Sequence, residues 1–261
     1  MTHLPIAKKS LGQHWLSDEK TLQAIATSIQ IDNNDVVVEI GPGAGTLTNH
    51  LARMAKKVIA IEFDDQLAKN LSKQFADTNV QVINQDILTF DFSSLPATYK
   101  VVANIPYYLT SNLLRLLCEL PNAPTDMALL VQKEVAERVA AGPGQASLLS
   151  NSVQLYYEPA VGLVVPAHLF TPPPKVDSQV IILHKRPQPL FAVETKEFFK
   201  LLRAGFSEKR KKLRNTLAGG LGIDKQAAEA LLVAANIDPA KRPQQLRLQD
   251  WYELYKEYKK L

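Results

Sequence analysis

The 261-residue sequence predicts an α/β fold, in which a mostly parallel sheet carries helices on both faces and a small all-α region follows. Three observations predict this fold. Short apolar runs alternate with stretches of helical periodicity between residues 36 and 141, which is typical of βαβ units. A glycine-rich turn, GPGAG, separates the first apolar run from the first helical stretch. Beyond a proline-containing linker at 186–190, the longer segments have helical spacing.

The individual elements follow from run length and periodicity. Five short apolar runs are predicted to be buried strands: 36–40, 57–62, 80–86, 100–105 and 127–132. Apolar side chains that recur every three or four positions predict helices at 46–55, 64–75, 111–120 and 133–141. Two further strand-like runs, 160–166 and 177–185, have no clear helix between them. They are expected to form an antiparallel pair at the edge of the sheet.

The C-terminal region is expected to hold three helices, at 194–219, 225–236 and 248–260. Gly219, Gly220 and Gly222 are expected to end the first of them. The predicted division of the chain is therefore a first domain over residues 1–186 and a helical domain over residues 187–261.

Composition limits the classes of function. Cys118 is the only cysteine, so an internal disulfide and a cysteine-rich metal site are both excluded. We expect a cytoplasmic protein without a membrane span, because neither a signal-peptide pattern nor about 18 consecutive apolar residues occurs. The charge is uneven: residues 196–261 hold 15 Lys and Arg against 8 Asp and Glu. This excess favours a polyanionic partner, although a solvated helical face would have the same composition.

The glycine-rich turn predicts a nucleoside site. Gly41, Gly43 and Gly45 allow the backbone to approach a ligand closely, and Glu62 ends the next strand, where an acid can accept hydrogen bonds from ribose hydroxyls. Asp86 ends the third strand and could accept from an adenine amino group, or could cap the following helix instead. NAD and S-adenosylmethionine both contain adenosine. The G-x-G-x-G spacing departs from the G-x-G-x-x-G that a dinucleotide pyrophosphate would favour, and the segment after the fourth strand discriminates further.

The segment NIPY, residues 104–107, follows the fourth strand and faces the same crevice. The Asn104 side-chain oxygen and the Ile105 carbonyl could both accept hydrogens from an exocyclic amine, and Pro106 restricts the residue before it. Tyr107 offers a flat face for a base. The alternative is a strand end with an Asn cap, a proline turn and packed tyrosines.

Eight segments together resemble the rRNA adenine dimethyltransferase family, in particular its branch that acts on small-subunit rRNA. They are KKSLGQHWL (8–16), VVEIGPGAGTLT (37–48), AIEFD (60–64), NQDIL (84–88), NIPYYLT (104–110), QKEVAERVAA (132–141), FTPPPKVDSQV (170–180) and FSEKRKKLRNTL (206–217). The resemblance runs almost end to end. It implies a class I methyltransferase fold with a Rossmann-like sheet and S-adenosylmethionine as the methyl donor, without a metal.

The resemblance also implies roles for individual residues. The donor site would be lined by His14, Leu16, Gly41, Gly43, Glu62, Asp86 and Asn104. His14 stands where the family usually has Asn, and Trp15 where it usually has Phe. The target base would meet Asn104, Ile105, Pro106 and Tyr107, with Phe170 on its other side, unless Phe170 only packs beneath the proline loop. The basic run Lys209, Arg210, Lys211, Lys212 and Arg214 is expected on a helix that follows RNA phosphates.

The resulting hypothesis is dimethylation of two adjacent adenosines near the 3′ end of 16S rRNA, within a partly assembled small subunit, by a monomer. A large-subunit rRNA methylase of the macrolide-resistance type is a close alternative. An assembly factor in which methylation is secondary is another. An NAD-dependent oxidoreductase is disfavoured, because the chain lacks the sixth-position glycine and an evident hydride-relay His or Tyr-Lys pair.

Overall fold

The computed structural model describes residues 4–208 and 210–261, so Lys209 of the basic run lies outside the described residues. The chain forms two compact units, one of residues 1–136 and 158–185, the other of residues 137–157 and 186–261. Residues 137–157 group with the C-terminal segment because their helix contributes Leu155 to the core of the second unit. The predicted division had placed residues 137–157 and Arg186 in the first domain, and as a division into domains it stays a prediction.

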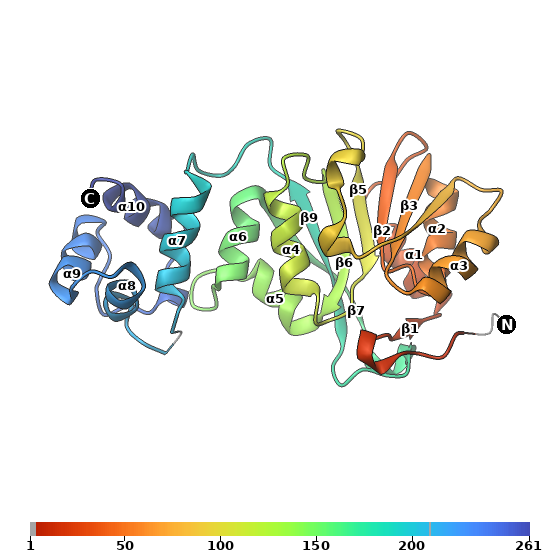
Figure 1. The fold of residues 1–261 in the computed structure, drawn as a ribbon. Coiled ribbons are helices and arrows are strands. Elements are labelled where there is room, and N and C mark those ends of the chain that lie inside the picture. Colours follow the sequence, from red (N-terminus) through yellow and green to blue (C-terminus); the bar gives the residue numbers. More distant parts are fainter. Residues whose placement is uncertain (1–3, 209) are drawn as a thin grey trace. The chain divides into compact units, whose positions relative to one another are not determined.

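A seven-stranded sheet forms the first unit, with strand order β4-β3-β2-β5-β6-β9-β7 (Figure 1). The strands are β2 (Val36–Ile40), β3 (Lys57–Glu62), β4 (Val80–Asn84), β5 (Lys100–Asn104), β6 (Asp126–Gln132), β7 (Tyr157–Val165) and β9 (Ser178–Lys185). All neighbouring pairs from β4 to β6 are parallel, whereas β9 is antiparallel to β6. β7 lies beyond β9, at the edge. The predicted, mostly parallel α/β sheet is confirmed.

Helices cover this sheet: α1 (Glu19–Ala26), α2 (Thr46–Met54), α3 (Asp65–Gln74), α4 (Thr110–Glu119) and α5 (Lys133–Ala140). α1 was not predicted from the sequence; its N-cap Asp18 accepts a hydrogen bond from the Thr21 amide at 2.9 Å. Ile25 of α1 and Leu51 of α2 are fully buried against strand residues such as Val37. Burial of each such aliphatic side chain stabilises the fold by about 1.5–3 kcal/mol.

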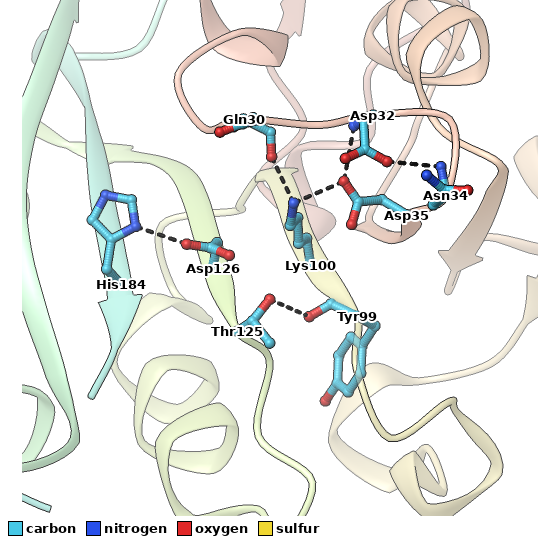
Figure 2. Close-up of polar contacts among 9 residues, drawn as sticks. All are labelled: Gln30, Asp32, Asn34, Asp35, Tyr99, Lys100, Thr125, Asp126 and His184. Atoms are coloured by element: carbon cyan, nitrogen blue, oxygen red, sulfur yellow. Dashed lines mark hydrogen bonds and ion pairs between the residues drawn. The ribbon is translucent and has the colours of Figure 1, made fainter. Parts of the chain in front are cut away.

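Polar contacts at the amino ends of the strands fix their alignment (Figure 2). The Lys100 ammonium at the start of β5 donates to Asp35 Oδ2 at 2.7 Å and to the Gln30 carbonyl at 2.8 Å. Asp35 immediately precedes β2, so this partly buried ion pair joins the starts of two adjacent strands. His184 and Asp126, partners in the β6–β9 register, contact each other at 2.7 Å. These contacts leave the carboxyl ends of the strands free for a binding site.

The second unit is helical: α6 (Leu148–Tyr156), α7 (Thr195–Gly205), α8 (Leu213–Leu221), α9 (Lys225–Ala234) and α10 (Leu248–Tyr258). Trp251, Phe198 and Leu217 are completely buried at its centre. α6 was not predicted from the sequence, because five of the nine residues in LLSNSVQLY are among the weaker helix formers: Ser150, Asn151, Ser152, Val153 and Tyr156. Among the described residues of both units, no helix is long and apolar enough to cross a bilayer.

The predicted helix at 194–219 is wrong, because the chain folds back between α7 and α8. Gly220 lies directly against Ala204, and a Cβ at Gly220 would come within 2.6 Å of the Ala204 Cα. A single straight helix would hold these two residues far apart, whereas close packing of α7 on α8 brings them together. Gly219 and Gly220 are therefore inside α8, and Gly222, with a φ of 69°, caps it. The basic residues 210–212 lie in the connecting segment and not on a helix.

Because of the close contact at Gly220, substitution by alanine should change the stability of the protein in opposite directions at Gly219 and Gly220. Gly220→Ala is expected to destabilise the protein by about 1–3 kcal/mol, because the added methyl group overlaps Ala204. Gly219→Ala is the matched control: its methyl group meets nothing within 4 Å, and alanine is the better helix former by about 1 kcal/mol. Urea unfolding followed by circular dichroism measures both. Equal effects would contradict the packing of α8 on α7.

Candidate active site

The carboxyl ends of four parallel strands define the site. β2 lies between β3 and β5 in the sheet. From β2 the chain continues to β3 and β4 on one side, and it then crosses to β5 and β6 on the other side. A crevice forms where the strand order reverses in this way. Gly41, Glu62, Asp86 and Asn104 all lie at this edge, at or just after the ends of β2, β3, β4 and β5.

The glycine turn after β2 is shaped by two contacts of Gly43. Its amide donates to Glu62 Oε2 at 3.0 Å. Its φ is 59°, and a Cβ there would lie 2.5 Å from the Trp15 ring. Only glycine meets both conditions, because the left-handed conformation and the close approach of the indole each exclude a side chain.

Glu62 is held rigidly at the end of β3. The residue is 5% exposed, and its second carboxylate oxygen accepts from the Asp64 amide at 2.8 Å. Burial raises the pKa of Glu62, and the backbone hydrogen bonds from Asp64 and Gly43 partly oppose that rise. The carboxylate lines the pocket and keeps lone pairs for a further donor.

Glu39 is a second buried carboxyl at this edge, and the sequence analysis did not identify it. It is 1% exposed, and its Oε2 has no hydrogen-bond partner among the described residues. Burial raises its pKa to about 8, opposed by Thr48 and reinforced by the negative charge of Glu62. Its signal in the sequence is the single acid within the apolar run VVVEI. An unsatisfied acid that lines the pocket is suited to a cationic or hydrogen-donating ligand.

The turn after β5 provides two free acceptors. The Ile105 amide donates to the Leu130 carbonyl at 3.1 Å, which ties the turn to β6. Within residues 4–208 and 210–261, neither the Asn104 side-chain amide nor the Ile105 carbonyl makes a hydrogen bond. Both residues line the pocket together with Pro106 and Tyr107.

A two-stranded ribbon closes another wall of the pocket. It pairs β1 (Trp15–Leu16) with β8 (Phe170–Thr171), with Leu16 opposite Phe170. The Thr46 hydroxyl donates to the Leu16 carbonyl at 3.0 Å. His14 lies 2.6 Å from the Pro172 carbonyl through Nδ1, and its ring is stacked on Tyr107 with 5.9 Å between centroids. The ribbon therefore brings the N-terminal segment to the acceptor turn.

Two predicted site residues also have structural roles. Asp86 Oδ1 caps the short helix η2 (Ile87–Thr89) by accepting from the Leu88 amide at 2.9 Å, which leaves Oδ2 free of that contact. Phe170 is 3% exposed and packs in the apolar cluster with Leu16 and Val165, while part of its ring lines the pocket. Asp86 thus caps a helix and Phe170 packs in the core, which are the structural roles that the sequence left open. The contacts of Asp86 to adenine and of Phe170 to the target base stay predictions.

One pocket of about 200 Å³ contains all eleven predicted residues of the first unit. They are His14, Leu16, Gly41, Gly43, Glu62, Asp86, Asn104, Ile105, Pro106, Tyr107 and Phe170. Further lining residues were not predicted, among them Trp15, Glu39, Phe63, Leu88 and Tyr108. Phe63, which follows Glu62, is 57% exposed, and Leu88, two residues after Asp86, is 42% exposed. Among the described residues, no group of three His, Cys, Asp or Glu side chains could hold a metal ion.

A basic surface lies in the second unit. The Leu213 amide donates to the Lys241 carbonyl at 2.8 Å, which places Lys241 and Arg242 beside the connecting segment that carries Arg210, Lys211 and Lys212. No ion pair involves these five cations among the residues that the structure describes. Arg214, also expected to bind RNA, is instead paired with Glu229 at 2.9 Å. We call Arg210, Lys211, Lys212, Lys241 and Arg242 the basic turn.

Comparison with known proteins places this arrangement in a family context. A family model described as ribosomal RNA adenine dimethylase matches residues 6–260. A protein of Dehalococcoides mccartyi named ribosomal RNA small subunit methyltransferase A is 42% identical over 257 residues, which cover 97% of this chain and 88% of the relative. The protein of the same name from Alkaliphilus metalliredigens is 42% identical over 261 residues, covering 95% and 91%.

Two solved structures share the whole architecture. A dimethyladenosine transferase from Plasmodium falciparum aligns with a TM-score of 0.80 and 28% identity, covering 95% of this chain and 98% of that one. The 23S rRNA methyltransferase ErmE aligns with a TM-score of 0.73 and 28% identity, covering 93% and 98%. The likeness therefore includes both the sheet unit and the helical unit.

The buried acid Glu39 predicts a specific dependence of stability on pH. Because its pKa rises from 4.5 to about 8 on folding, the folded state retains the proton while the unfolded state releases it. The free energy of unfolding should therefore fall between pH 4.5 and 8 more steeply for the parent than for Glu39→Gln. Urea unfolding of both proteins at a series of pH values measures the difference. Parallel curves would mean that the folded carboxyl ionises normally.

Proposed function

Because the chain belongs to the ribosomal RNA adenine dimethylase family, we propose that it methylates the exocyclic amines of two adjacent adenosines near the 3′ end of 16S rRNA. The methyl donor is S-adenosylmethionine, and the product is N6,N6-dimethyladenosine. The substrate is a partly assembled small ribosomal subunit in the cytoplasm, and the enzyme acts as a monomer. One observation carries the proposal: two unpaired acceptors, Asn104 and the Ile105 carbonyl, face the pocket that holds the glycine turn and its acids.

The acidic and apolar lining of the pocket suits the donor. The donor is cationic at its sulfonium and ammonium groups, and the pocket contains the carboxyls of Glu39, Glu62 and Asp86. Glu62 accepts from the ribose hydroxyls and Asp86 from the adenine amino group, as in other nucleoside sites at the ends of parallel strands. Gly41 leaves room for a ligand to approach the backbone, because a Cβ there would meet only Pro106, at 4.0 Å. The exposed side chains of Phe63 and Leu88 provide apolar contact for adenine.

The acceptor turn prepares the target nitrogen. The lone pair of an adenine amino group is delocalised into the ring, so the nitrogen is a weak nucleophile. The Asn104 oxygen and the Ile105 carbonyl accept the two amine hydrogens, which favours a tetrahedral nitrogen and localises its lone pair. They also stabilise the positive charge that develops on nitrogen, in a geometry set before the reaction begins.

The transfer itself is a displacement at carbon. S-adenosylmethionine, when bound, supplies an activated methyl group on a sulfonium that leaves as a neutral thioether. The new bond joins that carbon to N6, and the nitrogen then loses a proton to water. Tyr107 holds the flipped base by stacking, a contact worth about 1–3 kcal/mol, with Phe170 on the other side. The second methylation repeats the same steps on the same nitrogen.

The basic turn of the second unit binds rRNA. Its cations form no ion pair within the described chain, although the charge of Lys241 contributes to lowering the pKa of Asp250, so they are available to phosphates. The sequence predicted that a basic helix binds the RNA. In the structure the basic residues lie in a turn instead, and Lys241 and Arg242 belong to the same surface. Arg214 contributes less directly, since its guanidinium is paired with Glu229.

The small subunit is favoured over the large one by the relatives. Those at about 42% identity bear the name ribosomal RNA small subunit methyltransferase A, whereas the 23S enzyme ErmE is 28% identical. The direct test incubates the protein with labelled S-adenosylmethionine and unmethylated small subunits, and then maps the label on the RNA. Label at two adjacent adenosines near the 3′ end is the expected result. No label at those two adenosines, while large subunits incubated in parallel become labelled, would reject the proposal.

Removing the amide of Asn104 should abolish most of the chemistry and little of the donor binding. Asn104→Ala is expected to lower the methylation rate by about 100-fold or more, because one of two acceptors for the amine hydrogens is lost. Calorimetry should still detect donor binding. Asn70→Ala is the matched control, since Asn70 lies exposed on α3, and it should behave as the parent. Parent-like turnover of Asn104→Ala would refute the assigned role.

Two triple variants that each remove three positive charges should differ in how strongly they weaken RNA binding. Alanine at Arg210, Lys211 and Lys212 removes unpaired cations, so affinity for small subunits should fall and the salt slope should decrease by up to about 3.

The control for that variant replaces three cations that already have acidic partners. Alanine at Lys256, Lys259 and Lys260 breaks contacts to Glu253, Glu194 and Glu257, with the same change in net charge. Filter binding across a salt series should leave its slope close to that of the parent. If both variants lose the same slope, net charge, and not the basic turn, determines binding.

A further inference from the structure

The Tyr107 ring is hydrogen-bonded at its tip to a residue far away in sequence. Its hydroxyl lies 2.8 Å from the hydroxyl of Ser178. Ser178 is completely buried, whereas Tyr107 is half-buried and lines the pocket. Ser178 belongs to the segment PPPKVDS, which the resemblance singled out without assigning it a role, and it does not line the pocket itself.

Ser178 is placed much more rigidly than Tyr107. It is the first residue of β9, and it pairs with Gln132 in a register that runs through seven residue pairs with β6. Tyr107 lies in the turn between β5 and α4, where its carbonyl accepts a long bond of 3.4 Å from the Thr110 amide. Shorter bonds hold the turn backbone, from the Ile105 amide at 3.1 Å and the Leu109 amide at 3.0 Å, but they do not fix side-chain torsions. The angle of the ring therefore depends on the contacts of its face and its hydroxyl.

The two hydroxyls also satisfy each other. A buried hydroxyl without a partner is costly, and within the described residues Ser178 has no other side-chain hydrogen bond. Serine fits because it is small enough for the buried start of the strand and still carries a hydroxyl. At the ring face, His14 is stacked on Tyr107 with an interplanar angle of 26°, so tip and face are both constrained.

We propose that Ser178 is a positioning residue that sets the angle of the Tyr107 ring against which the target adenine stacks. The proposal rests on the proposed function, in which Tyr107 holds the base. Ser178 acts only through Tyr107, by a hydrogen bond from the sheet to the acceptor turn. A ring at the wrong angle would hold the base away from Asn104 and the Ile105 carbonyl, and small errors of placement slow transfer strongly.

Deleting either hydroxyl should therefore slow methylation by the same amount. Ser178→Ala and Tyr107→Phe are each expected to lower kcat on small subunits about tenfold, with donor affinity unchanged in calorimetry. The double variant should be no slower than either single one, because both remove the same contact. Independent, multiplying losses would overturn the proposal, since Ser178 would then act by packing. Parent-like kcat for Ser178→Ala would overturn it as well.

A second buried tyrosine provides the matched control. Tyr99 directly precedes β5 at the opposite end of that strand, and its hydroxyl is buried without a hydrogen bond in the described part of the chain (Figure 2). Tyr99→Phe removes the same group at the other end of β5, away from the pocket, so its kcat should equal that of the parent. A tenfold loss in Tyr99→Phe would mean that any buried hydroxyl produces the effect, and the proposal would fail.

A structural measurement separates this proposal from the proposed function. Crystal structures of the parent and of Ser178→Ala should differ in the Tyr107 ring, which should be tilted or disordered in the variant. An unmoved ring in Ser178→Ala overturns the positioning role whatever the activity. If the parent fails to methylate small subunits, the proposed function fails, and the two crystal structures still decide whether Ser178 positions Tyr107.

Discussion

The hydrogen bonds to the Glu62 carboxylate are the contacts on which the site depends. One oxygen accepts from Gly43 in the turn after β2, and the other from Asp64 in the turn after β3. They lock two adjacent strand ends into one shape. That shape places Gly43 under the Trp15 ring, and Trp15 belongs to the ribbon that carries His14 and Phe170 to the pocket. The glycine turn, the N-terminal segment and the proline segment are therefore parts of one assembly.

Without a ligand, ionising the buried acids of the pocket costs the folded protein free energy. Glu39 and Glu62 are both buried, and burial raises the pKa of each. Ionised carboxyls in such surroundings are unfavourable unless a cation or several donors approach them. A ligand that brings positive charge and hydroxyl donors would relieve this cost. The same feature that weakens the fold at high pH thus favours a cationic nucleoside in the crevice, which is the charge and chemistry of the proposed donor.

The two units divide the charge and the tasks. The acids that line the pocket lie in the sheet unit, whereas the basic turn lies in the helical unit. In the helical unit, the fold-back at Gly220 converts a continuous basic sequence into a turn that meets Lys241 and Arg242. The cations of this turn form no ion pair among the described residues, while Lys256 of α10 and Lys259 and Lys260 beyond it are paired with acids. Chemistry and RNA attachment are therefore proposed for different parts of the chain.

Local pattern alone determined the parallel strands, most of the helices around them and the pocket residues at the strand ends, from Gly41 to Tyr107, whereas His14, Leu16 and Phe170 followed only from the family resemblance. Parallel strands of short length place their ends at one edge, so residues that follow consecutive strands must meet there. Tertiary contacts alone decided what no local pattern encodes. The fold-back between α7 and α8 depends on Gly220 against Ala204, and α6 is stabilised by burying Leu155 in the helical core. Glu39 and Ser178 became visible only through burial and partners, because a lone acid in an apolar run and a serine after a proline loop have no distinctive spacing.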